Sequence, residues 1–76
     1  ESGNSLIAPL PGHVRQILVK KGDMVKKDQA VVILEAMKME HTILSPKTGK
    51  VVEIYYSEGD QVLEGAELLA LEEDQS

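Results

Sequence analysis

Apolar residues follow two patterns along the chain, and both are typical of short β-strands. In residues 13–19 and 50–56, apolar side chains alternate with polar ones, which indicates strands with one buried face. Residues 30–34 and 68–71 are short continuous apolar runs, which a helix could also contain. The β-branched residues of 30–34 and the turn signals close to both runs favour buried strands. The pattern therefore predicts an all-β chain.

The second half of the chain repeats the first. With an offset of 37 and no gaps, residues 7–35 align with residues 44–72, and nine of the 29 pairs are identical. Average composition would give roughly two matches by chance. The identical pairs are mostly turn formers and β-branched residues. We therefore predict that each half forms the same small β unit and that the two units pack with two-fold pseudo-symmetry.

Glycine and proline separate the predicted strands. Gly22–Asp23 and Gly59–Asp60 mark tight turns, because glycine reaches positive φ without strain. Pro9, Pro11 and Pro46 cannot donate to a central β-ladder, so they mark strand ends or loops. We expect a flattened barrel-sandwich of two small antiparallel sheets, with about seven or eight short strands in all.

Length and composition limit the size of the fold. Seventy-six residues allow one small domain, and 42% of them are apolar, with neither Phe nor Trp available for the core. We expect a linker at residues 1–5, the domain at residues 6–71 and an acidic tail at residues 72–76. Because the chain begins with Glu1 rather than Met, we expect it to be part of a longer polypeptide.

Charge and the length of the apolar runs argue against several kinds of partner. A formal net charge of −5 and only two aromatic residues disfavour nucleic acid, which needs a cationic surface and stacking platforms. No apolar run approaches the roughly 18 residues that span a bilayer, so we expect no membrane segment. The acidic charge also disfavours self-association, and we expect the isolated domain to be a monomer.

No group of residues predicts catalysis. His13 and His41 are the only histidines, there is no Cys, and two imidazoles alone do not make a metal site. We expect both at surface or turn positions. No Ser/His/Asp arrangement of a nucleophile with its base has supporting context in the sequence. The sequence therefore predicts no metal, no catalytic residue and no independent enzymatic activity.

The segment that joins the two repeats breaks the pattern of both. One predicted strand ends at residues 33–34 and the next begins at residues 42–44, so a hairpin is the economical link. Lys38 then lies at the tip, flanked by Met37 and Met39. Methionine is pliable and apolar, and it is often used on surfaces that another protein must bind.

Residues 35–40, Glu-Ala-Met-Lys-Met-Glu, match the Ala/Val-Met-Lys-Met hallmark of biotinyl domains, the carrier domains of biotin-dependent carboxylases. The resemblance covers about residues 6–71 and includes Pro-Leu-Pro-Gly at residues 9–12. It implies that biotin is attached covalently to Lys38 by a biotin protein ligase. It also implies that the ligase recognises the residues around this lysine, which are Glu35, Ala36, Met37, Met39 and Glu40.

The resemblance implies a carrier that performs no bond chemistry itself. A biotin carboxylase partner carboxylates the biotin ring with MgATP and bicarbonate, and a carboxyltransferase partner passes the carboxyl group to an acceptor. Lys38 would carry the cofactor between these sites on its flexible stem. Ordinary alternatives remain open: Lys38 as an exposed hairpin lysine, Met37 and Met39 packed against the sheet, and Glu35 and Glu40 as solvated strand-end charges.

Related carriers are separated by few residues. Lipoyl domains share the architecture but usually have Asp-Lys-Ala where this chain has Met-Lys-Met at residues 37–39, which favours biotin. The gapless repeat leaves no room for the thumb insertion of some bacterial acetyl-CoA carboxylase carriers. Residues 40–43, Glu-His-Thr-Ile, look most like the 3-methylcrotonyl-CoA carboxylase alpha subunit. Propionyl-CoA, acetyl-CoA and pyruvate carboxylases are the alternatives.

The resemblance also implies a location, which is the mitochondrial matrix in a eukaryote and the cytoplasm otherwise. An alternative from a different class is an unmodified structural module in which Lys38 is never acylated. Such a module would not be a substrate of biotin ligase, and it gives no reason for Met on both sides of Lys38.

Overall fold

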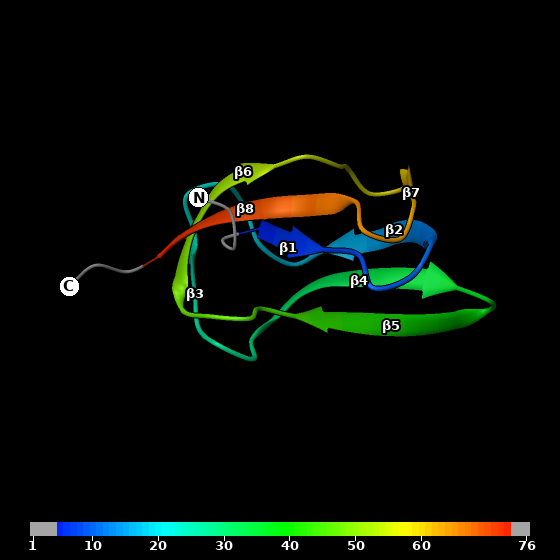
Figure 1. Cartoon of the computed structure of the whole chain (residues 1–76), viewed down its shortest axis with the longest axis horizontal. Coiled ribbons are helices and arrows are strands. Elements are labelled where there is room, and N and C mark those ends of the chain that lie inside the picture. The colour runs from blue at the N-terminus through cyan, green and yellow to red at the C-terminus, as the bar shows by residue number, and fades with distance from the viewer. Residues whose placement is uncertain (1–4, 74–76) are drawn as a thin grey trace.

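The computed structural model describes residues 5–73, and within this range the chain forms eight strands and no helix (Figure 1). In chain order the strands are β1 Ser5–Ile7, β2 Gly12–Ile17, β3 Met24–Val25, β4 Ala30–Ala36, β5 Met39–Leu44, β6 Gly49–Ile54, β7 Gln61–Val62 and β8 Glu67–Glu73. The all-β prediction is confirmed. In the same range, no helix is long and apolar enough to cross a membrane.

Two four-stranded antiparallel sheets face each other, with the orders β1-β8-β6-β3 and β5-β4-β2-β7. An offset of 37 carries β2, β3 and β4 onto β6, β7 and β8, and it also carries the register. The pair Val14↔Leu34 in one sheet corresponds to Val51↔Leu71 in the other. The predicted two-sheet sandwich and its two-fold pseudo-symmetry are therefore confirmed.

The chain passes from one sheet to the other at every connection in the described range except the one between β4 and β5. This connection lies where the first repeat meets the second. Residues 8–11 join β1 to β2, and the equivalent residues of the second repeat, 45–48, join β5 to β6. The two connections are equally short, so neither contains a thumb insertion. The β4–β5 hairpin extends to the right-hand extremity in Figure 1, and β1 begins and β8 ends toward the other end.

Aliphatic side chains from both sheets fill the space between them. The largest fully buried ones are Leu34, Leu68, Leu69, Val14, Val25, Val31, Val32, Val51 and Val62. Burial of each such side chain contributes roughly 1.5–3 kcal/mol relative to exposure. In a domain of this size the apolar positions of both repeats must meet in one layer, and this requirement brings the two sheets together.

The Gly-Asp turns have the same structure in both repeats. Gly22 and Gly59 have φ of +98° and +94°, in the left-handed region that glycine enters without strain. The carboxylate of Asp23 accepts a hydrogen bond from the backbone N–H of Lys20 at 2.9 Å, and the carboxylate of Asp60 accepts one from the equivalent N–H at 2.8 Å. The repeated dipeptide therefore supplies both the turn conformation and its side-chain cap.

The strand boundaries differ from the expectation by a few residues. The strands predicted at residues 13–19 and 50–56 end earlier, at Ile17 and Ile54, because the chain then crosses to the other sheet. β1 begins at Ser5, inside the expected linker, and β8 continues to Glu73, inside the expected tail. Pairing with a neighbouring strand thus extends order beyond the apolar run. The rest of the expected linker and tail, residues 1–4 and 74–76, lies outside the described residues.

Candidate functional site

The β4–β5 hairpin closes with the shortest possible link, a two-residue turn. Pairing continues up to Ala36↔Met39, so only Met37 and Lys38 lie between the strands. Both have positive φ, at +54° and +66°. Two consecutive left-handed residues define a type I′ turn, which matches the right-handed twist of the flanking strands. The predicted hairpin with Lys38 at its tip is confirmed.

This turn is unusual in composition, because type I′ turns favour Asn-Gly or Gly-Gly. A residue with a Cβ costs roughly 1–2 kcal/mol in the left-handed region. Met37 and Lys38 therefore occupy a strained turn that glycine would form more easily. Such strain persists only where the surrounding structure imposes it, and it is most frequent at functional sites.

All three central residues of the hallmark are exposed to solvent. Met37 is 88% exposed, Met39 is 61% exposed, and Lys38 between them is exposed as well. The interpretation that the two Met side chains pack against the sheet is therefore wrong, because the tip extends past the core. Two apolar side chains beside one primary amine form a small surface that a partner can bind, and nothing in the described structure covers it.

Ala36 differs from its neighbours in the hallmark, because it is buried at 6% exposure. Its side chain faces the side of β4 that Leu34 also faces, since alternate residues of a strand share a face. At this position a partner could not contact the side chain directly. We therefore expect any influence of Ala36 on recognition to act through packing at the base of the turn.

Glu35 and Glu40 lie directly opposite each other in β4 and β5, on the outer face of the hairpin. Arg15 of β2 joins them: its Nη1 is 3.6 Å from Glu35 Oε1 and its Nε is 2.5 Å from Glu40 Oε2. His13 Nε2 lies 3.1 Å from the same Glu35 oxygen. The two carboxylates are thus held in an ion-pair network on three adjacent strands, which offsets their mutual repulsion.

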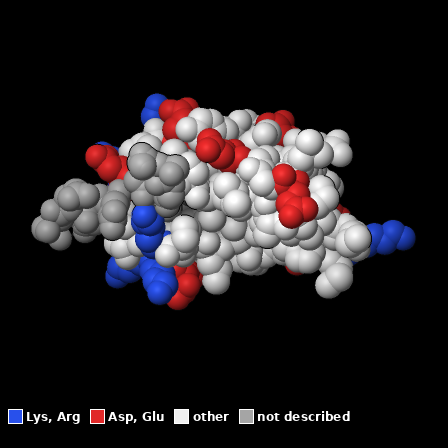
Figure 2. All heavy atoms as spheres, in the orientation of Figure 1, with Lys and Arg blue, Asp and Glu red and all other residues white. Residues whose placement is uncertain are grey.

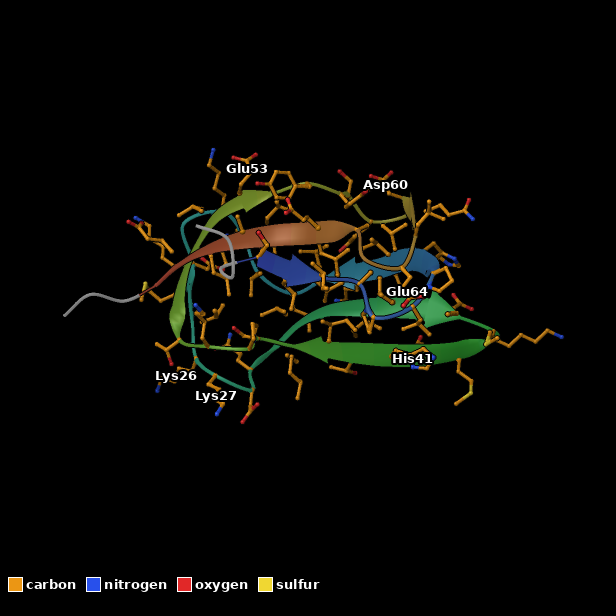
Figure 3. All side chains as sticks on the ribbon, viewed as in Figure 1. Lys26, Lys27, His41, Glu53, Asp60 and Glu64 are labelled. Carbon is orange, nitrogen blue, oxygen red and sulfur yellow. The ribbon has the colours of Figure 1, made fainter. Side chains whose placement is uncertain are left out.

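The turns of the two repeats carry opposite charge. The turns of the first repeat, residues 20–28, contain four Lys and two Asp, which sum to +2, and they adjoin β6 far from the hairpin. The equivalent residues 57–65 contain two Glu and one Asp, which sum to −3, and they adjoin β2 beside the hairpin. Figure 3 shows Lys26 and Lys27 at one end and Asp60 and Glu64 toward the other. Figure 2 shows most of the cationic side chains of the visible face at the β3 end. Lys38 therefore lies at the end of the molecule that holds the acidic turns, where Arg15 is paired with Glu35 and Glu40.

The described residues hold no candidate metal centre. Among them, no group of three His, Cys, Asp or Glu side chains could hold a metal ion. His13 lies on the surface in β2, and His41 is half-buried in β5 rather than in a turn. A groove of about 540 Å³ lies between the two crossing segments that follow β2 and β6, and no hairpin residue lines it. The amine of Lys38, by contrast, is exposed at the tip of the hairpin.

Two residues near the tip were not predicted as part of the site. Arg15 appears in sequence only as a polar position of an alternating strand, and its partners lie 20 and 25 positions away. Gly12 appears in sequence as a glycine of the Pro-Leu-Pro-Gly segment and of the repeat, and its place beside Ala36 follows from the β2–β4 register. Finding Arg15 or Gly12 would have required the register between strands that are distant in sequence, which a single sequence does not reveal.

Solved structures with the same fold include a carboxylase and a lipoyl domain. A single-chain, multi-domain long-chain acyl-CoA carboxylase matches with a TM-score of 0.88 and 27% identity over 99% of this chain and 8% of its own. The lipoyl domain of the 2-oxoglutarate dehydrogenase complex of Azotobacter vinelandii matches with a TM-score of 0.80 and 32% identity over 93% of this chain and 98% of its own. The fold and the hairpin lysine thus define the class, which is that of biotinyl and lipoyl carrier domains.

Sequence relatives narrow this class to biotin. Residues 4–71 match the Biotin_lipoyl family, described as biotin-requiring enzymes, and the chain belongs to this family. Mouse methylcrotonoyl-CoA carboxylase subunit alpha is 43% identical over 92% of this chain and 10% of its own length. The pig propionyl-CoA carboxylase alpha chain is 40% identical over 95% of this chain and 10% of its own. The biotin carboxyl carrier protein of tomato acetyl-CoA carboxylase is 39% identical over 91% of this chain and 99% of its own.

The chain is therefore a non-catalytic biotin carrier domain of the kind found in biotin-dependent carboxylases, and biotin is its cofactor. It spans about one tenth of the length of the methylcrotonoyl-CoA carboxylase subunits that it matches. The predicted family, carrier role and cofactor are confirmed. The relatives include carriers of several acyl-CoA carboxylases, so they leave open which carboxylase this domain serves.

Proposed function

We propose that Lys38 is the residue that carries biotin. The observation that supports this most strongly is the two-residue turn, which holds one primary amine beyond the core on the only hairpin within a single sheet in the described range. Met37 and Met39 supply apolar surface on either side for the modifying enzyme. Arg15 is another cation near the hairpin, but its guanidinium is a far poorer nucleophile than an amine, and its side chain is paired with two carboxylates.

The modification forms one amide bond. Lys38 Nζ, once deprotonated, attacks the carboxyl carbon of biotin in an activated form that the ligase makes from ATP. The leaving group of that activated acid departs, and one proton is released. Because an ammonium is replaced by a neutral amide, the formal charge of the domain changes by −1, from −5 to −6. The domain contributes accessibility and orientation, and the ligase supplies activation and proton removal.

As a carrier, the modified domain would move carboxybiotin between two partner sites. The long flexible arm would enter the biotin carboxylase site to receive the carboxyl group and the carboxyltransferase site to deliver it. β1 begins and β8 ends toward the end opposite the hairpin (Figure 1), so neither of these strand ends lies beside the amine. We propose that Glu35 and Glu40, together with the exposed Met side chains, form the surface that these partners and the ligase recognise.

We infer that the acceptor is 3-methylcrotonyl-CoA. Three methylcrotonoyl-CoA carboxylase subunits are 43–46% identical to this chain, whereas the propionyl-CoA and acetyl-CoA carriers are 39–40% identical. The three methylcrotonoyl-CoA carboxylase subunits are described as mitochondrial. In a eukaryotic cell we accordingly place the domain in the mitochondrial matrix. The test is to exchange this domain for the native carrier of a methylcrotonyl-CoA and of a propionyl-CoA carboxylase. Higher turnover in the first enzyme supports the assignment, and higher turnover in the second contradicts it.

The first experiment is intact-mass analysis after incubation with biotin, ATP and a biotin protein ligase. We expect the wild type to gain one biotin amide, and Lys38→Arg to gain none, with peptide mapping to place the label. Circular dichroism of Lys38→Arg should match the wild type, because the exposed side chain makes no packing contact that the fold needs. A folded wild type that gains no mass contradicts the proposal, and lipoylation with a lipoate ligase is then the next reaction to test.

A further inference from the structure

Gly12 and Ala36 approach each other closely at the base of the hairpin. His13 pairs with Glu35, so Gly12 at the start of β2 lies beside the end of β4. A Cβ added to Gly12 would be 2.5 Å from the carbonyl oxygen of Glu35 and 3.0 Å from Cβ of Ala36. Cβ atoms are essentially never found within 3.0 Å of another heavy atom. Since the first contact is with backbone, the two strands must separate to admit any side chain at this position.

The other glycines for which the surroundings are defined have a different role. Gly22, Gly59 and Gly65 have positive φ, and a Cβ on any of them would meet nothing within 4 Å. They are needed for backbone conformation. Gly12 does not adopt a left-handed conformation, and its surroundings are crowded. Gly12 is therefore needed for the close approach of β2 to β4.

The contact lies one residue from the turn. Ala36 pairs with Met39 on its other side, and Met37 and Lys38 join the two directly. A two-residue turn has no slack, so a displacement of Ala36 moves the turn with it. β5 is an edge strand in the described sheet, and no strand on its outer side would resist the movement.

From this geometry we propose that Gly12 is a positioning residue for Lys38: its missing side chain sets the distance between β2 and β4 and hence where the hairpin presents the amine. The proposal deepens the proposed function and rests on it. Gly12 touches neither the amine nor the cofactor arm. It acts through Ala36, which accounts for a small buried residue within a hallmark whose other central residues are exposed.

The second repeat offers a matched control. Gly49 is equivalent to Gly12 at the offset of 37, and it pairs with Val25 as Gly12 pairs with Val62. Gly49 lies at the start of β6, in the sheet that lacks the hairpin. Gly12→Ala and Gly49→Ala therefore make the same chemical change at equivalent places, and only the first lies beside Lys38.

The experiment compares biotin transfer by a biotin ligase to the wild type, Gly12→Ala and Gly49→Ala, with urea unfolding to confirm that each variant is folded. We expect kcat/KM to fall about tenfold for Gly12→Ala, because misplacement of a reacting group is costly, and to change less than about twofold for Gly49→Ala. The NMR amide shifts of Met37, Lys38 and Met39 should change in Gly12→Ala alone. Adding Ala36→Gly removes one of the two crowded contacts and should restore part of the lost rate.

Three outcomes overturn the proposal. The first is equal transfer rates for folded Gly12→Ala and Gly49→Ala, and the second is tip amide shifts that do not change in Gly12→Ala. If Gly12→Ala does not fold, Ala36→Leu, which places at this position a residue that the hallmark does not contain, crowds the same contact from the other strand and should lower kcat/KM in the same way. The third outcome is loss of folding in both Gly12→Ala and the Ala36 variant, which would show that the contact stabilises the whole fold rather than positioning the tip. Lack of transfer to the wild type and Gly49→Ala contradicts the proposed function instead, and the tip amide shifts still test the positioning role without ligase.

Discussion

The turns that build the sandwich and the turn that presents Lys38 use the same region of backbone conformation with different residues. In the building turns, glycine occupies the left-handed positions Gly22, Gly59 and Gly65. Asp28, equivalent to Gly65 at the offset of 37, has φ of +71°, and Asp tolerates this conformation better than most residues. At the tip, two adjacent residues with long side chains adopt it instead.

The two kinds of turn therefore differ in what selects their residues: low backbone strain in the building turns, and exposed side chains at the tip. A turn whose only task is to reverse the chain is served best by the residue with the lowest strain. The tip could be served in the same way by Asn-Gly, but such a turn would carry neither the amine nor an apolar side chain. The tip is therefore less stable than a glycine-containing turn would be, but it exposes an amine and apolar side chains. Because both kinds of turn lie in the same pseudo-symmetric fold, they can be compared directly.

The largest effect on stability is expected in the building turns. Gly59→Ala should lower the free energy of unfolding by about 1–2 kcal/mol, because Ala is strained at φ of +94° although nothing crowds its Cβ. Urea unfolding measures this, and Gly22→Ala should show a loss of similar size since its φ is +98°. A loss near zero at both positions would show that these turns relax, and the contrast with the tip would then fail.

A smaller effect of opposite sign is expected at the tip. Met37→Gly relieves left-handed strain of roughly 1–2 kcal/mol and adds roughly 0.5–1 kcal/mol of unfolded-chain entropy, so unfolding should become harder by about 0.5–1 kcal/mol. Biotin transfer should nevertheless slow, because an exposed apolar contact is lost. Met24→Gly is the control, since Met24 is exposed in a strand and its replacement should destabilise. A stability loss in Met37→Gly would contradict the strain assigned to the turn.

The smallest effect is expected at the outer face of the hairpin. Arg15→Gln leaves Glu35 and Glu40 opposite each other without their shared cation, yet the side chains are partly exposed. The loss should be about 0.5 kcal/mol at low salt and should shrink at high salt. Lys21→Gln, which breaks a single pair with Glu53, should cost less. Equal and salt-independent losses would mean that the network around Arg15 adds nothing beyond an ordinary surface pair.

Much of the fold could be predicted because its information is local or periodic. The alternating segments, the Gly-Asp turns and the offset of 37 are visible without any knowledge of contacts, and together they led to two equivalent β units. The hairpin was predicted because the residues between the two repeats left room for little else. Lys38 was singled out by its flanking methionines and by the resemblance they carry, and its exposure at the tip agrees with that prediction.

The sequence by itself determined the strands, the pseudo-symmetry and the lysine at the centre of the chain, because each depends on residue types at short or regular spacing. Only the tertiary structure decided how the tip is supported. Arg15 meets Glu35 and Glu40, and Gly12 meets Ala36, through the register of β2 with β4, which is set by the packing of one core rather than by any local signal. The left-handed turn at Met37 and Lys38 was equally hidden, since neither residue favours that conformation. There the twist of two strands joined by two residues overrides local preference.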